Sequence, residues 1–414
     1  MNSSPRRSRT QHRLSILAFA VFSGLVALVS AAEPDSKPAP QTTAPRVFSS
    51  TGIPNDENFF PIAVWLQAPR NAAKYKALGI NLYVGLWRGP NEEQFRELAE
   101  AGMPIICEQN EFALRNKENA LIAGWMHGDE PDNAQSLGSG KGYGPPITPE
   151  KVLADYRKQR GADPSRPVLL NLGQAVAWDN YIGRGVRRNH PEDYPRYAEG
   201  CDIASFDIYP VVHDAPEISG KLEYVARGMA RLVEWTGGKK PVWSCIECTH
   251  ISNAQKKASP AQVRVEVWMA LVRGARGLIY FVHQFKPSFI EAGLLDDPEM
   301  MKAVTAINGE ISELAPVLNT PSMPNDAVRV VTPEGGADEA AGTIATMMKE
   351  RGNHRYLFAV NLSSAKTEGS FKLADLPGER RIAVHGEDRS TTMNDGKFVD
   401  EFAPYAVHRY EFDR

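Results

Sequence analysis

The sequence has little cysteine: four residues in a chain of 414. A small disulfide-stapled scaffold is therefore excluded, because such domains need a dense set of cysteine pairs. All four lie in or beside apolar runs, so we predict that they are small buried hydrophobes: Cys107, Cys201, Cys245 and Cys248. The last two have the spacing of a metal-binding pair, but no second Cys or His pair completes a zinc site, and no metal is predicted there.

An excess of positive charge is also missing. The net charge is −3, and residues 1–32 contain four Arg and no acidic residue, which leaves the remainder at −7. A mildly acidic chain is poorly suited to binding nucleic acid or an anionic membrane, so neither is predicted as a partner.

Long apolar runs are confined to the N-terminus. A basic segment ending at Arg13 is followed by the apolar run 14–29 and the small residues 30–32. This order is typical of a secretory signal peptide over residues 1–32, and it predicts a secreted or periplasmic protein with no membrane contact after cleavage. An uncleaved anchor is the alternative. Residues 33–57 are predicted to be a flexible linker, because their first part is rich in Pro, Ser, Thr and Ala.

No glycine-rich phosphate-binding turn follows the first predicted strand, which counts against a dinucleotide-binding fold. Instead, short apolar runs alternate with amphipathic stretches from about residue 58 to 320. The predicted strands are 60–66, 81–87, 104–108, 121–126, 168–172, 203–209, 241–246 and 277–282. Eight βα units in about 260 residues predict an α/β fold of the (β/α)8 TIM barrel type.

The periodicity changes after Pro324. Short alternating runs are separated by turn signals, and Asn394-Asp395-Gly396 is typical of a tight hairpin. Residues 325–414 are therefore predicted to form a small all-β sandwich domain.

Two predicted strands end in carboxylates. Strand four leads into Gly128-Asp129-Glu130-Pro131, and strand seven ends at Cys245-Ile246-Glu247-Cys248. The active site of such a barrel lies at the C-terminal ends of its strands, and strands four and seven lie across the mouth from each other. Glycosidic bonds are cleaved by a pair of carboxyl groups, so Glu130 and Glu247 are the candidate catalytic residues.

In these segments the chain resembles the large (β/α)8-barrel clan of retaining glycoside hydrolases that includes β-galactosidases, β-xylosidases and endo-β-glycanases, in which a C-terminal β-sandwich is common. The resemblance covers about residues 58–320. It implies that Glu130 is the acid/base and Glu247 the nucleophile in a double displacement on β-glycosidic bonds. Asp129 stands where that clan usually carries Asn, and an ionised Asp cannot donate a hydrogen bond to a sugar hydroxyl.

Other groups near the predicted strand ends suit a sugar site. Tyr209 occupies a position where the clan often has a Tyr that bonds the nucleophile, and Arg88 is placed to keep Glu247 ionised. Amide and aromatic side chains bind sugar hydroxyls and ring faces. The candidate substrate-binding residues are Asp129, Tyr209, Arg88, Asn171, Gln174, Trp87, Trp243 and His283.

The sequence therefore predicts a secreted glycoside hydrolase with a carbohydrate substrate and no cofactor. Two alternatives remain: a carbohydrate-binding barrel that has lost catalysis, and a metal-dependent barrel hydrolase. The second would use His127, His250 and His283, which lie near the predicted mouth but have no ligand-type spacing. Glu108, at the end of strand three, is a reserve carboxylate.

Overall fold

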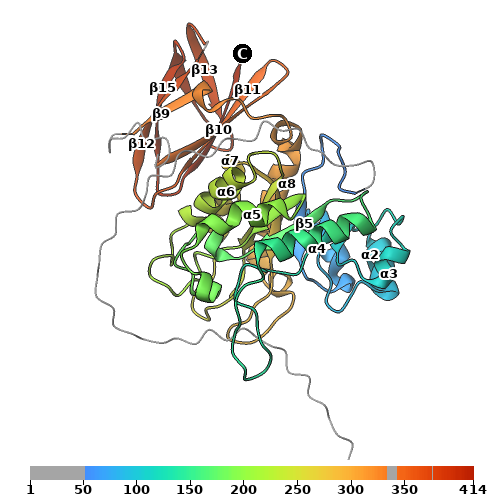
Figure 1. Cartoon of the computed structure of the whole chain (residues 1–414). Coiled ribbons are helices and arrows are strands. Elements are labelled where there is room, and N and C mark those ends of the chain that lie inside the picture. The colour runs from blue at the N-terminus through green and yellow to red at the C-terminus, as the bar shows by residue number, and fades with distance from the viewer. Residues whose placement is uncertain (1–51, 333–342, 375) are drawn as a thin grey trace, which may run out of the picture.

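The computed structural model describes residues 52–332, 343–374 and 376–414. The predicted signal peptide, and the predicted linker as far as residue 51, lie outside the described residues. Two parts follow each other along the chain: a closed barrel surrounded by helices, and an all-β domain (Figure 1).

The barrel consists of eight parallel strands in sequential order, which confirms the predicted fold. Each strand pairs with the next, and β8 closes on β1. The strands are β1 (Ile62–Trp65), β2 (Leu82–Val84), β3 (Ile105–Cys107), β4 (Ile122–Met126), β5 (Val168–Leu172), β6 (Ile203–Phe206), β7 (Val242–Glu247) and β8 (Ala275–Phe281).

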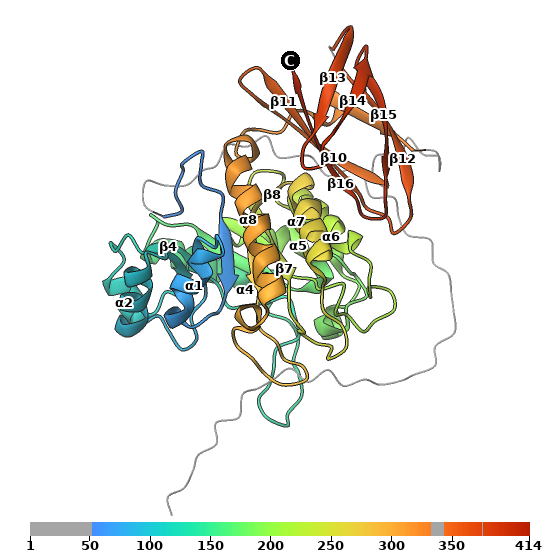
Figure 2. The same ribbon diagram turned by 180° about the vertical axis from the view of Figure 1, so that it is seen from behind.

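Helices follow the strands and cover the outside of the barrel (Figures 1 and 2). They are α1 (Ala72–Ala77), α2 (Glu92–Ala101), α3 (Glu111–Arg115), α4 (Pro149–Ala162), α5 (Tyr194–Glu199), α6 (Glu223–Trp235), α7 (Pro260–Val272) and α8 (Pro298–Leu318). Their starts follow from local chemistry: Ser259 caps α7 through a capping box with Gln262, and Thr148 accepts a hydrogen bond from the Lys151 amide.

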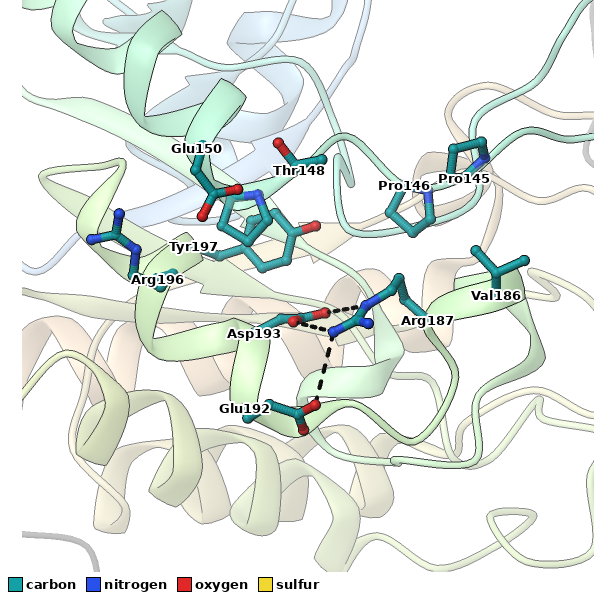
Figure 3. A pocket seen from close by; sticks show the side chains of 11 residues that line it. Pro145, Pro146, Thr148, Glu150, Val186, Arg187, Glu192, Asp193, Arg196 and Tyr197 are labelled. Carbon is teal, nitrogen blue, oxygen red and sulfur yellow. Dashed lines mark hydrogen bonds and ion pairs between the residues drawn. The ribbon is translucent and has the colours of Figure 1, made fainter.

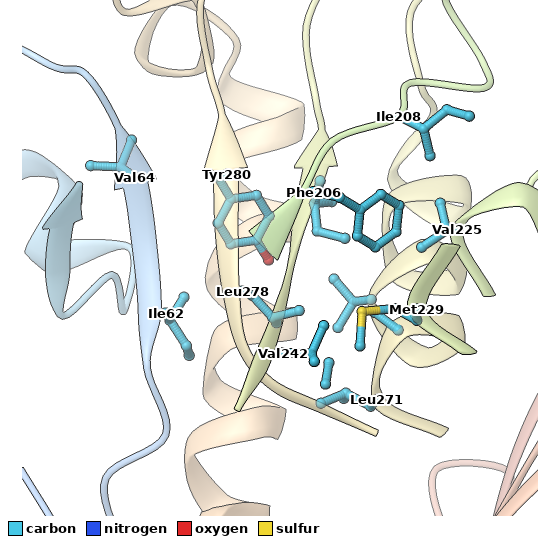
Figure 4. Close-up of a cluster of buried hydrophobic side chains, with 14 of the residues drawn as sticks. Ile62, Val64, Phe206, Ile208, Val225, Met229, Val242, Leu271, Leu278 and Tyr280 are labelled. Atoms are coloured by element: carbon cyan, nitrogen blue, oxygen red, sulfur yellow. The ribbon is translucent and has the colours of Figure 1, made fainter. Parts of the chain in front are cut away.

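Strand alternation separates two apolar layers. On β1, Ile62 and Val64 face the helices, whereas Ala63 and Trp65 face the barrel interior. Figure 4 shows the outer layer, in which Phe206 of β6 packs with residues such as Met229 of α6. Because strands of a parallel barrel are buried on both faces, they read as nearly continuous apolar runs, which made them visible in the sequence.

The all-β domain is an eight-stranded antiparallel sheet folded around its own core as a β-sandwich. Asp395 and Gly396, both with positive φ (48° and 73°), make the predicted turn between β14 and β15. The strands are β9 (Val328–Val331), β10 (Ile344–Arg351), β11 (His354–Asn361), β12 (Thr367–Leu373), β13 (Glu379–Val384), β14 (Arg389–Asn394), β15 (Lys397–Phe402) and β16 (Val407–Asp413).

The sandwich packs on the barrel through β11. Leu357 and Ala359 face the sandwich core, and the alternate residue Phe358 stacks on Trp268 of α7, with ring centroids 5.2 Å apart. The indole of Trp268 donates to Glu310 of α8 at 3.1 Å, and Arg409 of β16 pairs with the same carboxylate at 2.9 Å. The two domains are therefore joined by both apolar and ionic contacts.

Trp268→Ala should lower the free energy of unfolding by about 3–5 kcal/mol, the usual cost of removing a buried Trp. The indole is fully buried, and its loss leaves a cavity and removes one of the donors to the Glu310 carboxylate. Urea denaturation measures the change. Trp87→Ala is the matched control, since Trp87 is 55% exposed and should change stability by about 0.5 kcal/mol or less. Equal effects of the two variants would show that Trp268 does not hold the domains together.

Within the described part of the chain, no helix is both long and apolar enough to span a membrane.

Candidate active site

The candidate site lies at the C-terminal ends of the barrel strands. Figures 1 and 2 show that the long loop after β4 projects from the end of the barrel opposite to the β-sandwich. The sandwich therefore leaves this mouth open, and the side chains at the strand ends decide what the mouth can do.

Glu130 is held in an unusual backbone conformation. Its φ is 43°, in the left-handed region that side chains other than glycine and asparagine rarely adopt. Its amide donates to the carbonyl of Asn171 in β5 at 3.1 Å, and its own carbonyl accepts from the Asn133 amide at 3.1 Å. Left-handed residues of this kind concentrate at functional sites, where surrounding contacts hold the strain.

The Glu130 carboxyl meets a second carboxyl, that of Asp207, and donates a hydrogen bond to it. Asp207 comes directly after β6, and its amide donates to the Leu172 carbonyl of β5 at 3.1 Å. Glu130 and Asp207 thus approach from the two strands that flank β5. Burial, and then the charge of Asp207, raise the pKa of Glu130 well above its usual value. Burial and the charge of Asp129 raise the pKa of Asp207 to about 7.

Asp129 has a different partner. Its Oδ1 accepts from the side-chain amide of Asn171 at 3.0 Å, and Asn171 Oδ1 accepts from the Ser205 hydroxyl at 2.8 Å. The residue keeps exposed surface in the open mouth, but its carboxyl lies deep enough that burial raises its pKa to about 6. The structure therefore brings Asp129 and Asn171 together at the strand ends.

Behind Glu130 lies a rigid polar layer centred on Asp132. This buried carboxylate accepts from the Gly173 amide at 2.9 Å and from the Tyr194 hydroxyl at 2.7 Å. Arg184, also buried, donates to the Asp132 carbonyl at 3.0 Å and to Asp193 at 2.8 Å. Because all these groups are paired, the layer fixes the loop after β4, and its hydrogen-bonding groups are already used within the protein.

The structure places Glu247 away from the Glu130 cluster. Glu247 ends β7, and it is 0% exposed. Its two oxygens accept from the amides of Val211 and Val212 in the loop after β6, at 2.7 and 3.1 Å. It also accepts a hydrogen bond from the protonated carboxyl of Glu266 in α7. In this conformation a sugar in the mouth cannot touch the Glu247 carboxylate.

Glu247 and Glu266 form a fully buried acid pair, and no Lys, Arg or His of the described residues forms an ion pair with either carboxyl. Burial raises the pKa of Glu247 to about 7, and burial together with the Glu247 charge raises the pKa of Glu266 further above its usual value. Both groups therefore hold protons in the folded state at pH values where the unfolded chain has released them. The pair contributes stability below a pH of about 4.5, and this contribution is lost as the pH rises to about 7 and beyond.

The stability of Glu266→Gln should accordingly fall less between pH 5 and pH 8 than the stability of the parent. The amide can still donate to Glu247 but carries no proton to lose. Urea denaturation at the two pH values gives the difference, and Glu234→Gln, an exposed acid of α6, is the control. Identical pH dependence in the parent and in Glu266→Gln would contradict the buried-pair assignment.

Tyr209 and Arg88 occupy different parts of the mouth. Tyr209 is buried, its ring packs on Phe281 of β8 with centroids 5.2 Å apart, and its hydroxyl donates to the Asp207 carboxyl. Arg88 is exposed, and its guanidinium lies 6.0 Å from the ring centroid of Trp87. The structure therefore puts Arg88 and Trp87 together on the rim and does not bring Arg88 to the buried Glu247.

Gln174 and Trp243 are both enclosed. Gln174 is 8% exposed and accepts from His213 at 3.0 Å. Trp243 is 0% exposed in the barrel interior, against Gly277, and its indole N–H has no partner among the described residues. A Cβ at Gly277 would approach the Trp243 ring to 2.6 Å, so the glycine makes room for the indole. Trp243 is thus buried in the barrel interior and does not offer an exposed ring for stacking.

His283 follows β8 in an aromatic setting. Its ring stacks on Phe285 with centroids 6.0 Å apart, and its Nε2 lies 3.2 Å from the side-chain nitrogen of Gln67. Since that nitrogen can only donate, His283 accepts at Nε2 and carries its proton on Nδ1, and the ring also forms a hydrogen bond with the Leu66 backbone. Burial lowers the pKa of His283 to about 4, so the ring is neutral at ordinary pH.

The three histidines that were considered as metal ligands do not share a partner: each forms hydrogen bonds in a different part of the mouth. His127 bonds the Gly200 carbonyl at 2.8 Å, and His250 bonds carbonyls of its own loop. Across residues 52–332, 343–374 and 376–414, no group of three or more His, Cys, Asp or Glu residues is arranged to hold a metal ion. The four cysteines are free and buried, as predicted.

A separate surface pocket lies between the end of the loop after β4 and the segment leading into α5. Figure 3 shows Asp193 paired with Arg187 beneath its proline-rich wall. None of the candidate residues lines it. The lining residues are Pro145, Pro146, Thr148, Pro149, Glu150, Val186, Arg187, Glu192, Asp193, Arg196 and Tyr197.

Sequence reasoning missed Asp207 and Glu266. Asp207 had a usable signal: it lies two residues before Tyr209 and two after Ser205, so strand alternation points it into the mouth. Glu266 had none, because a Glu within a helix is normally exposed and only the packing of α7 on β7 buries it.

No protein-family model matches the chain, and no curated protein matches it. The chain is similar in structure to a proposed α-galactosidase from Bacteroides fragilis, at 9% identity and a TM-score of 0.50, over 86% of this chain and 80% of that one. It is likewise similar to a maltogenic α-amylase from Thermotoga neapolitana, at 8% identity and a TM-score of 0.50, over 86% and 99%. An endoxylanase of glycoside hydrolase family 30 from Clostridium papyrosolvens has 11% identity and a TM-score of 0.43, over 90% and 100%. The similarity to the α-galactosidase and to the α-amylase, at 9% and 8% identity, shows only the fold: a barrel with a C-terminal β-domain.

Proposed function

We propose that this protein is a secreted glycoside hydrolase in which Glu130 is the general acid. The observation that carries the proposal is the strained, half-buried Glu130 at the end of β4, beside a second carboxyl, that of Asp207. Burial and the charge of Asp207 raise the pKa of Glu130 well above its usual value. A carboxyl with a raised pKa at the strand ends of a (β/α)8 barrel suits glycoside cleavage, because a general acid must protonate the departing oxygen.

The surroundings of Glu130 support a sugar as the ligand. Asp129 and Asn171 present oxygen and amide groups beside it, and the Tyr209 hydroxyl bonds the neighbouring Asp207 carboxyl. Exposed Trp87 adds an apolar ring at the rim. Polar groups that converge on a concave site next to aromatic faces suit a ligand with many hydroxyls and an apolar ring face.

The double-displacement mechanism and the β-linkage rest on the resemblance of the strand-four and strand-seven segments. In that mechanism Glu247 attacks the anomeric carbon, and Glu130 later deprotonates the water that releases the sugar. Since Glu247 has no exposed surface in the free chain, its action requires the loop at Val211 and Val212 to shift when substrate binds.

A catalytically silent carbohydrate-binding barrel is the second candidate, and one observation favours it: the enclosed Glu247. The test is a screen of residues 33–414 on aryl α- and β-glycosides and on polysaccharides, with detection of new reducing ends. Glu130→Gln is run beside it. The proposal expects turnover of a β-glycoside that is lost in Glu130→Gln. Turnover of α-glycosides alone would overturn the β-assignment, and binding without turnover would favour the silent barrel.

A further inference from the structure

Asp207, which pairs with Glu130, has no role in the double displacement proposed for Glu130 and Glu247. Asp207 is half-buried in the mouth, it is anchored through its amide to the Leu172 carbonyl, and its carboxyl also accepts from the Tyr209 hydroxyl. The Glu130 carboxyl donates to the same side chain. Asp207 therefore presents a carboxyl to Glu130 that is fixed through its own backbone and by the Tyr209 hydroxyl.

The groups that face Glu130 carry acidic or neutral side chains. From the β4 end and its loop these are Asp129 and Asp132, from the β6 end Asp207 and Tyr209, from the loop after β5 Tyr181, and from β7 Cys245. Asp132 already accepts from the Gly173 amide and the Tyr194 hydroxyl, and Asp129 is bonded to Asn171. Asp207 is therefore the one of these carboxylates that acts on Glu130 through both a charge and a direct hydrogen bond.

We infer that Asp207 is a positioning residue for Glu130: it accepts the hydrogen bond of the Glu130 carboxyl and keeps the proton on that acid until the glycosidic oxygen takes it. This inference rests on the proposed function, because it assigns Asp207 to the same site. When substrate binds, the Glu130 O–H turns from Asp207 to the leaving oxygen. The Asp207 charge then favours the return of a proton to Glu130 after each turnover.

Loss of this charge should be visible in the pH profile. In Asp207→Asn the Glu130 carboxyl ionises at lower pH, since the repulsion between two carboxylates is gone. The alkaline limb of kcat/KM should move to lower pH by about one unit or more, with a smaller change in KM than in kcat. Asp207→Glu should restore part of the shift, and the exposed Asp214→Asn in the same loop should leave the profile unchanged.

A readout independent of activity separates this inference from the proposed function. Carboxyl-carbon NMR of ¹³C-labelled Glu follows the Glu130 titration directly, with Glu130→Gln identifying its resonance. The inference expects titration at lower pH in Asp207→Asn than in the parent, even if no glycoside is turned over. An unshifted Glu130 titration would overturn it. A parallel loss of kcat at all pH values with no movement of the alkaline limb would also overturn it.

Discussion

Replacement of Glu130 by Ala is expected to lower kcat for an unactivated glycoside about 10²- to 10⁴-fold, the usual contribution of a positioned general acid. Its left-handed backbone and its hydrogen bond to Asp207 hold the carboxyl in the mouth, and burial together with the Asp207 charge raises its pKa well above the usual value. The loss should be much smaller in the first step with an aryl glycoside whose leaving group departs without protonation.

The second step should then become limiting. A double displacement needs Glu130 again, to deprotonate water. Glu130→Ala should therefore accumulate a glycosyl-enzyme, which mass spectrometry of the intact protein detects as an added sugar. Azide needs no general base and should restore turnover. Circular dichroism of the variant provides the control, because loss of fold would abolish both accumulation and rescue.

Replacement of Glu247 by Ala is expected to reduce hydrolysis to near the uncatalysed background, even for an aryl glycoside with a very good leaving group. Without the Glu247 carboxylate no covalent intermediate forms, and azide should instead give the glycosyl azide of opposite anomeric configuration. Product anomers are read by proton NMR. Glu247→Gln is the matched variant, because its amide oxygen can still accept from the Val211 or Val212 amide.

Because Glu247 is buried, the activity of Glu247→Gln decides whether Glu247 is the nucleophile or a structural acid. If Glu247→Gln folds and still hydrolyses the aryl glycoside, Glu247 is a structural acid held by Val211, Val212 and Glu266. Asp207 would then be the remaining carboxyl beside Glu130. If activity vanishes in a folded variant, the loop after β6 must open for catalysis.

The barrel could be predicted because burial on both faces gives its strands continuous apolar runs, and caps such as Ser259 mark the helix starts. Glu130, Asp129 and Asn171 could also be predicted from their positions at or near the ends of predicted strands, and the structure brings them together. The direction of Glu247 could not be predicted. Trp243 and Cys245 of β7 face the barrel interior, and strand alternation predicts the same direction for Glu247. The Glu247 carboxyl instead bonds the amides of Val211 and Val212 and the carboxyl of Glu266 in α7.

Arg88 shows a similar limit. Its place after β2 suggested an ion pair across the mouth, yet its positive φ of 55° and the adjacent Trp87 ring keep it on the rim. Loop conformation and the choice between competing partners depend on residues far away in the chain, and neither leaves a periodic signal in the sequence.

The anomer of the azide product formed by Glu130→Ala from an aryl β-glycoside tests the central claim most directly. If Glu130 is the acid/base of a double displacement, azide attacks the glycosyl-enzyme and proton NMR shows the β-glycosyl azide. The α-glycosyl azide, or hydrolysis at the parental rate with no azide product, would contradict the assignment of Glu130.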